Sequence, residues 1–120
     1  MAKYSRQSIE RAFPIVDDSA RAAISHAEAV AALVKQGFAE TTSIMLISSY
    51  KLLRKGSVYK RAFSEEQTRV FLSRIEAVYG QEALKVALRA ADQHLSYRTA
   101  IGHRLPGLHA VVKHFHEHLV

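Results

Sequence analysis

Residues 39–56 read AETTSIMLISSYKLLRKG, and this stretch decides the fold. It contains no proline, and its first glycine is Gly56 at the end. The four consecutive apolar residues 44–47 (IMLI) point in all directions if the chain turns by about 100° per residue. A helix that is apolar on every side belongs in the middle of a bundle. We therefore predict a central helix over residues 39–55.

Before this helix, the sequence predicts two helices separated by Pro14. A short helix over residues 5–13 is expected to end there, because the residue before a proline is disfavoured in the helical region. Asp17 and Asp18 are then expected to cap a second helix that runs to Gly37. Its apolar residues recur every three or four positions, at Ala20, Ile24, Ala27, Val30 or Ala31, and Val34. The many alanines predict a closely packed neighbouring helix on that face.

After the central helix, three more helices are predicted. Residues 64–67 (SEEQ) form a capping-box pattern that opens a helix ending at Gly80. A long helix over residues 81–101 follows and ends at Gly102, and Pro106 is suited to the first position of a last helix. No stretch alternates with a period of two. The predicted fold is all-α: a compact helical bundle of about four long and one or two short helices, forming a single helical domain over residues 1–120.

The composition narrows the class of protein. Of the 120 residues, 48% are hydrophobic and 23% are charged, which suffices for one core and argues against disorder. The absence of cysteine excludes disulfides, thiolate nucleophiles and cysteine-ligated zinc. The longest apolar run, residues 44–47, is far shorter than the roughly 18 residues of a membrane span, and residues 1–13 lack a signal-peptide core. We predict a soluble, cytoplasmic protein with no membrane partner and no cofactor.

The most informative feature for function is a cluster of positive charge on a chain whose net charge is +6. No acidic residue occurs between Thr41 and Ser64. Five cations fall in this interval, and we call them the basic bend: Lys51, Arg54, Lys55, Lys60 and Arg61. Lysine and arginine neutralise phosphates and release counterions, while the neighbouring Tyr50 and Tyr59 are candidates for stacking on bases. The alternative is that the cations form a solvated face and the tyrosines are core residues.

These residues predict a non-enzymatic, basic nucleic-acid-binding module that contacts the phosphate backbone. Such a small module is expected to work as a subunit or regulator of a larger nucleoprotein assembly, with other protein subunits as partners. DNA and RNA remain equally open. Sequence-specific reading is not expected, because the helix over residues 39–55 offers few polar side chains to base edges. Further arginines are candidates to extend the surface: Arg69, Arg74, Arg98 and Arg104.

Two alternatives concern other classes of protein. Arg98 and His103 are separated by four residues, which resembles the R-x4-6-H signature of the HEPN family of helical, metal-independent ribonucleases. That resemblance implies a histidine that moves a 2′-hydroxyl proton and an arginine that stabilises the phosphorane, at a dimer interface. The other alternative is a protein-interaction domain without a nucleic-acid role. Phe38 and Phe63, both in breaks between helices, are its candidate exposed apolar residues.

Histidine is concentrated near the end of the chain, with six of the seven between His94 and His118. His114 and His118 are four residues apart and so share a helix face, a spacing that can hold zinc. No cysteine and no suitably placed carboxylate completes a site, so no metal site is predicted. Because histidine gains charge near pH 6.5, we expect anion binding to strengthen between pH 7.5 and 6.

Overall fold

The computed structural model describes residues 4–61 and 63–119, and these fold into six α-helices without a β-strand. The helices are α1 (Arg6–Ala20), α2 (His26–Lys35), α3 (Glu40–Lys55), α4 (Glu65–Tyr79), α5 (Gln81–Ala100) and α6 (Pro106–His118). The predicted all-α bundle is confirmed. The single-domain prediction for residues 1–120 stays a prediction, and it includes residues 1–3, 62 and 120, which lie outside the described part.

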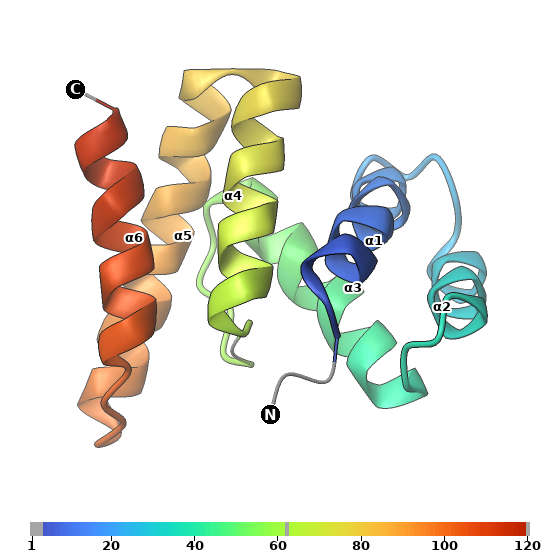
Figure 1. Ribbon diagram of the computed structural model, residues 1–120, viewed down its shortest axis with the longest axis horizontal. Coiled ribbons are helices and arrows are strands. Elements are labelled where there is room, and N and C mark those ends of the chain that lie inside the picture. The colour runs from blue at the N-terminus through green and yellow to red at the C-terminus, as the bar shows by residue number, and fades with distance from the viewer. Residues whose placement is uncertain (1–3, 62, 120) are drawn as a thin grey trace.

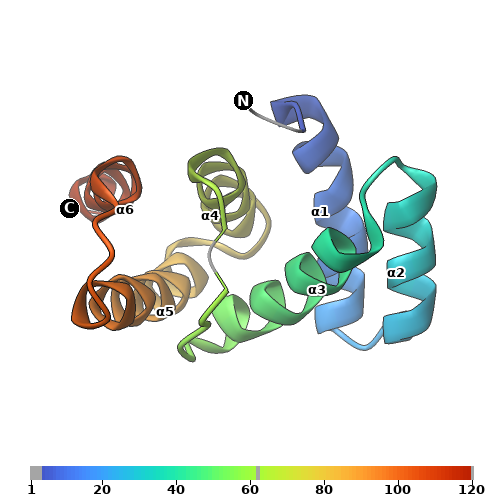
Figure 2. The same ribbon diagram turned by 90° about the horizontal axis from the view of Figure 1, so that it is seen from below.

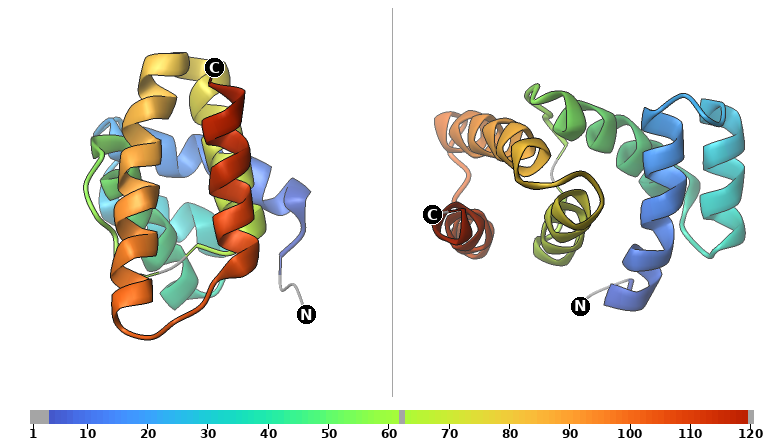
Figure 3. Two further views of the ribbon diagram at one scale, coloured as in Figure 1. Left: turned by 90° about the vertical axis from the view of Figure 1, so that its left-hand side faces the viewer. Right: turned by 90° about the horizontal axis from the view of Figure 1, so that it is seen from above.

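The helices form two groups of three, in chain order (Figure 1). Helices α4, α5 and α6 stand side by side and alternate in direction, so that α4 and α6 point the same way. Helices α1, α2 and α3 form the second group, in which α1 packs against α4 and α3 packs against α5 (Figure 2). Viewed from the α6 side, α1 lies behind and runs across the upright α4–α6 group (Figure 3). Helix α3 contacts α1, α2 and α5, as expected of a central helix.

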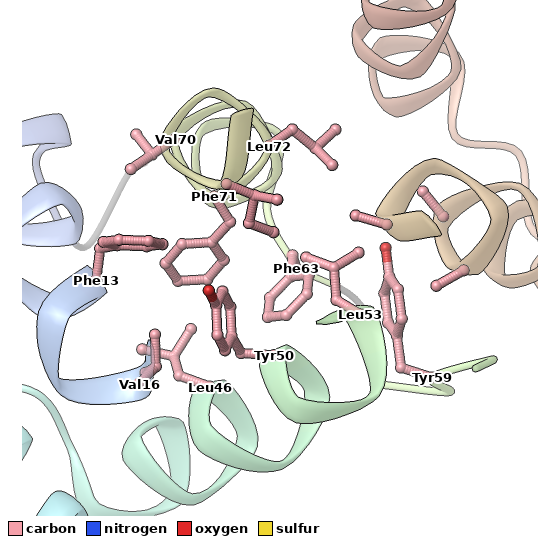
Figure 4. Packing of buried hydrophobic residues seen from close by; sticks show 14 of the residues in the cluster. Phe13, Val16, Leu46, Tyr50, Leu53, Tyr59, Phe63, Val70, Phe71 and Leu72 are labelled. Atoms are coloured by element: carbon pink, nitrogen blue, oxygen red, sulfur yellow. The ribbon is translucent and has the colours of Figure 1, made fainter. Parts of the chain in front are cut away.

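The core between the two groups is built on a chain of aromatic rings (Figure 4). Tyr50 of α3 meets Phe13 of α1 edge-on, at 5.8 Å between ring centroids, and Phe71 of α4 at 5.3 Å. Phe71 in turn meets Phe63 at 5.2 Å. Leu46 and Leu53 of α3 are fully buried beside these rings. Edge-to-face aromatic pairs contribute about 0.5–1.5 kcal/mol each beyond the area they bury, so this chain of rings ties α1, α3 and α4 together.

The predicted boundary between the first two helices is wrong. Helix α1 passes through Pro14, which is exposed, and continues to Ala20. Proline removes one backbone hydrogen bond from a helix interior, and here the packing of the apolar face of α1 outweighs that loss. Asp17 and Asp18 lie in the last turn of α1 and do not cap the next helix. The cap of α2 is Ser25, which forms a capping box with Glu28.

Helix α1 ends in a Schellman motif without glycine. The amide of Ala22 donates to the carbonyl of Ser19, and the amide of Ala23 donates to that of Asp18. Ala22 has a φ of +60°, a left-handed conformation that glycine usually adopts at this position of a helix end. The same motif closes α2, α3 and α5 with glycine in the left-handed position, at Gly37, Gly56 and Gly102. Those three ends were predicted from the glycines and are confirmed.

The remaining helix ends also agree with the sequence prediction. Ser64 and Gln67 form the predicted capping box of α4, and Pro106 is the first residue of α6. Gly80 alone joins α4 to α5, with a φ of +93°. Over residues 4–61 and 63–119, no helix combines the length and apolar character needed to cross a membrane.

The close packing predicted for the alanine-rich face holds for only part of that face. Ala20, Ile24 and Val30 are partly buried against the core, and helix α2 also buries Ala29 and Leu33. Ala27, Ala31 and Val34 are exposed, and Val34 retains 45% of its accessible surface. Helix α2 is therefore attached to the molecule along a narrow strip.

Candidate nucleic-acid interface

The basic bend lies where α3 ends and the chain turns back along α5. Residues 57–61, which we call the return segment, are held against α5 by several contacts. The ring of Tyr59 stacks on that of His94, with centroids 4.3 Å apart and planes inclined by 13°. Nδ1 of His94 is hydrogen-bonded to the carbonyl oxygen of Tyr59, and Nη1 of Arg98 donates to that of Lys60 at 3.2 Å. The return segment is thus a packed part of the structure that presents its cations outward.

Four cations of the basic bend remain available to a ligand. Lys55, Lys60 and Arg61 are exposed, and Lys51 is half-buried. Among the described residues, none of the four is joined to a carboxylate by an ion pair. The end of α3 is negative in the helix dipole, which stabilises Lys51 and Lys55 locally but leaves their charges open to solvent.

Arg89 of α5 joins these residues, although it is not among the residues predicted from the sequence. A methyl group at Gly56 would lie 3.4 Å from a guanidinium nitrogen of Arg89, which places that cation beside the end of α3. Arg89 is exposed and has no ion pair with a described carboxylate. We call the resulting set the cationic corner: Lys51, Lys55, Lys60, Arg61 and Arg89. The only sequence signal for Arg89 is its position four residues after Lys85, on one face of a helix.

An aromatic side chain also lies at this corner. Nζ of Lys60 is 5.6 Å from the ring centroid of Tyr97, within cation–π range. Tyr97 is half-buried, so part of the residue is open to solvent. It is the aromatic residue that accompanies the exposed cations.

Tyr50 and Tyr59 do not have the predicted stacking role. They retain 0% and 1% of their accessible surface and lie within the core (Figure 4). Burial, and for Tyr50 also its hydrogen bond to the carboxylate of Asp17, raises the pKa of both hydroxyls well above the ordinary value. The ring of Tyr50 packs against Phe13 and Phe71, and the ring of Tyr59 packs against Phe63 and His94. A base cannot reach them in this fold.

Arg54, the fifth cation of the basic bend, is also a structural residue. Its Nη1 donates to Oδ1 of the buried Asp17 at 2.8 Å, and its guanidinium lies 3.9 Å above the ring of Tyr79. The same carboxylate accepts hydrogen bonds from the hydroxyls of Tyr50 and Tyr79. Asp17 therefore neutralises Arg54 and connects α1, α3 and α4. The predicted phosphate contact of Arg54 is replaced by this internal one.

The two residues of the ribonuclease alternative lie together at the end of α5. The amide of His103 donates to the carbonyl of Arg98 at 2.9 Å, and His103 is exposed. The guanidinium of Arg98 is half-buried and hydrogen-bonded to the return segment. Arg98 thus makes a structural contact, with the Lys60 carbonyl, in addition to the catalytic role that the HEPN resemblance implies.

The candidate residues of the protein-interaction alternative are not on the surface. Phe38 and Phe63 each retain 3% of their accessible surface. Phe38 packs on Tyr4 at 4.4 Å between centroids, and Phe63 packs on Tyr59 at 5.0 Å. Both rings close the ends of the core, and the predicted apolar patch built on them is wrong.

The other cations differ in their surroundings. Arg69 is paired with Glu66 at 3.2 Å and Arg74 with Glu10 at 3.0 Å, so neither extends the cationic corner as an open charge. Arg104 is exposed.

The C-terminal histidines contact carboxylates of neighbouring helices. His116 bonds Asp92 of α5 and His118 bonds Glu76 of α4, each at 2.9 Å. Within the described residues, no three histidine and carboxylate side chains gather closely enough to hold a metal ion. His114 and His118 line a cavity of about 240 Å³ between α4 and α6. These histidines therefore tie α6 to its two neighbours.

No protein-family model, curated protein or solved structure matches this chain, so its function has to be inferred from the surface described above.

Proposed function

We propose that this protein is a non-enzymatic module that binds the phosphate backbone of a nucleic acid through the cationic corner. One observation carries the proposal. The five cations of the corner have no carboxylate partner among the described residues. Elsewhere in the described part, six cations are paired with carboxylates, namely Arg6, Arg21, Arg54, Arg69, Arg74 and Lys85. The cations there without such a pair belong to different elements: Arg11 to α1, Lys35 to α2, Arg98 to α5, Arg104 to the α5–α6 connection and Lys113 to α6. Unpaired charge gathered at one place is what a polyanion requires.

The expected mode of binding is electrostatic. Each phosphate that a lysine or arginine neutralises releases condensed counterions, so affinity falls as salt rises. Five contacts predict a slope of log K against log salt of about −4.5 for duplex DNA and about −3.5 for a single strand. Contacts of this kind position the protein without reading sequence. Tyr97, beside Lys60, is placed to stack on an unpaired base, which would favour a single strand.

The corner is small, and a few phosphate contacts hold a partner weakly at physiological salt. We therefore propose that the protein acts as a subunit or regulator of a nucleoprotein assembly, in which other chains supply further contacts. Linking two weak sites raises the overall affinity through effective concentration, without any new contact.

Fluorescence anisotropy with labelled single- and double-stranded DNA and RNA tests this proposal, at two salt concentrations. The test variant carries Lys55→Glu, Lys60→Glu, Arg61→Glu and Arg89→Glu. A matched control carries Arg11→Glu, Lys35→Glu, Arg104→Glu and Lys113→Glu, four exposed cations without a described carboxylate partner. Both variants change the net charge equally. We expect salt-sensitive binding that the test variant loses and the control largely retains, with circular dichroism confirming that both are folded.

Three outcomes would overturn this proposal. Equal loss in both variants would mean that net charge, and not the corner, binds the nucleic acid. A folded protein that binds nothing at low salt would point to a protein partner. RNA cleavage in EDTA that disappears in His103→Ala would favour the ribonuclease alternative.

A further inference from the structure

His94 is the residue through which α5 holds the return segment. It retains 0% of its accessible surface, although it is a polar side chain. One face of its ring is covered by the ring of Tyr59, and Nδ1 is bonded to the carbonyl oxygen of the same residue. One turn later on α5, Arg98 bonds the next carbonyl, that of Lys60. Two residues of α5 thus grip two consecutive residues of the return segment.

The hydrogen bond at Nδ1 determines the protonation state of His94. A carbonyl oxygen only accepts, so Nδ1 carries the proton and donates it. In the neutral ring, Nε2 then has no proton. Nε2 is buried and has no hydrogen-bond partner among the described residues, and the same holds for Nε of Arg98. Burial lowers the pKa of His94, and the positive charge of Arg98 lowers it further, against the opposing effect of the Tyr59 carbonyl.

A second proton on His94 would be placed in an unfavourable position. It would sit on Nε2, which is buried without an acceptor and lies close to the cationic Arg98. Of the charged groups near the ring, Arg98 lies on α5 and acts on His94 directly, and Lys60 follows Tyr59 in the return segment. Asp92 of α5 acts on the hydroxyl of Tyr59 and is hydrogen-bonded to His116 of α6, not to His94. Protonation therefore favours any conformation in which the imidazole reaches water.

The return segment is the part that moves most easily when the imidazole is freed. Its other described hydrogen bonds are one from the amide of Ser57 to the carbonyl of Leu52, at the helix end, and one of 3.4 Å from Ser49 to the carbonyl of Arg61. Helix α5, in contrast, packs against α3, α4 and α6. Lys60 and Arg61 belong to this segment, while Lys51, Lys55 and Arg89 are on helices. Release of the segment would therefore remove two cations from the corner and leave three in place.

We infer that His94 is a positioning residue of the cationic corner: when neutral it holds Lys60 and Arg61 against α5, and when protonated it releases them. The consequence for binding rests on the proposed function, but the release of the segment does not. The corner accordingly has five fixed cations at neutral pH and three at acid pH. Its contribution to binding therefore weakens on acidification, which opposes the strengthening expected from the charge that the other histidines gain.

The release is tested first without nucleic acid. Backbone ¹⁵N order parameters of residues 59–61 are measured by NMR between pH 7.5 and 5, relative to those of α3. In the wild-type protein we expect them to fall from about 0.85, typical of rigid backbone, to below about 0.6 once His94 titrates. His94→Asn retains a donor for the Tyr59 carbonyl but does not titrate, and His94→Phe retains the stacked ring. Either variant that folds should show constant order parameters, whereas a constant value in the wild type would refute the release.

The effect on binding is measured by the salt dependence of anisotropy at both ends of the same pH range. The slope should fall by about 1.8 in the wild type for duplex DNA, which corresponds to two lost phosphate contacts, relative to the change in the His94 variant. The other histidines gain charge equally in both proteins, so the difference isolates His94. A parallel change in both proteins would overturn the inference. If the order parameters fall but nucleic acid is never bound, the positioning role of His94 stands and the proposed function fails.

Discussion

Asp17 is a buried carboxylate through which α1 is joined to two other helices. In the structure, Asp17 is 5% exposed and accepts hydrogen bonds from α3 and α4. Its partners Tyr50, Arg54 and Tyr79 lie far along the chain. No local pattern encodes such contacts, and for the same reason the burial of Arg54 could not be predicted.

The substitution Asp17→Ala should be strongly destabilising. It leaves the guanidinium of Arg54 and the hydroxyl of Tyr50 without their acceptor in a buried site, and breaking a buried pair costs about 3–5 kcal/mol. Asp18→Ala, which removes an exposed pair with Arg21, should cost less than about 1 kcal/mol. Urea denaturation of the two variants measures the difference. Equal costs would mean that the Asp17 network does not hold the helices together.

The substitution Ala22→Gly should stabilise the protein. A left-handed alanine costs roughly 1–2 kcal/mol, and the greater flexibility of glycine in the unfolded chain offsets about 0.5–1 kcal/mol of that. We expect the free energy of unfolding to rise by about 0.5–1 kcal/mol in thermal or urea denaturation. Ala23→Gly, at a position without a positive φ, is the control and should lower it. A loss of stability in Ala22→Gly would contradict the Schellman ending of α1.

At the scale of the elements, a helix boundary could be predicted from the sequence where the residue at the helix end has one dominant conformational role. Helices α3 to α6 were located well because their ends carry residues with one dominant conformational role, such as Gly56 and Ser64. The boundary between α1 and α2 is not predictable from the sequence, because Ala22 carries no such signal and because a proline ordinarily ends a helix. Local stereochemistry disfavours Pro14 in a helix interior, but the packing of the apolar face of α1 against the core outweighs this cost.

The surface was predictable only in part, for a related reason. Lys51, Lys55, Lys60 and Arg61 are close in sequence and remain close in space, so the chain itself reveals them. Arg89 reaches the same corner because α3 packs on α5, a contact that periodicity does not specify. The burial of Tyr50 and Tyr59 likewise follows from which faces of the helices meet.

The contact between α3 and α5 can be tested at Gly56. A methyl group there would lie 3.0 Å from Cγ1 and 3.2 Å from the carbonyl oxygen of Val86. The φ of Gly56, +74°, is close to that of Ala22, so Gly56→Ala has a backbone cost similar to the gain of Ala22→Gly. Overpacking adds about 1–3 kcal/mol. In urea denaturation, Gly56→Ala should therefore lower the free energy of unfolding by clearly more than Ala22→Gly raises it. Equal magnitudes would mean that α5 accommodates the methyl group without an energetic cost.

At the scale of the whole molecule, the burial of two tyrosine hydroxyls makes the fold sensitive to alkali. The unfolded chain loses tyrosine protons near pH 10, whereas the raised pKa values of Tyr50 and Tyr59 keep both neutral in the folded state. The unfolded state then binds fewer protons, so the free energy of unfolding falls as pH rises above about 10. Denaturation at pH 8 to 11, with tyrosinate absorbance, measures this fall. Tyr59→Phe should show a shallower fall, and an unchanged slope would count against burial of that hydroxyl.

The single-residue joint at Gly80 has a consequence for the order of folding. Helices α4 and α5 are joined by the shortest of the described connections, so their pairing closes almost no loop. Helix α1 also packs against α4, but α2 and α3 lie between them in the chain, so this contact closes a much longer loop. Because long loops are entropically costly to close, the α4–α5 hairpin should be formed in the folding transition state and α1 should dock after it. In stopped-flow kinetics, Ile75→Val should slow folding, while Val16→Ala should mainly accelerate unfolding. The cationic corner depends on α3 meeting α5, so it would then be assembled only after the α4–α5 hairpin has formed.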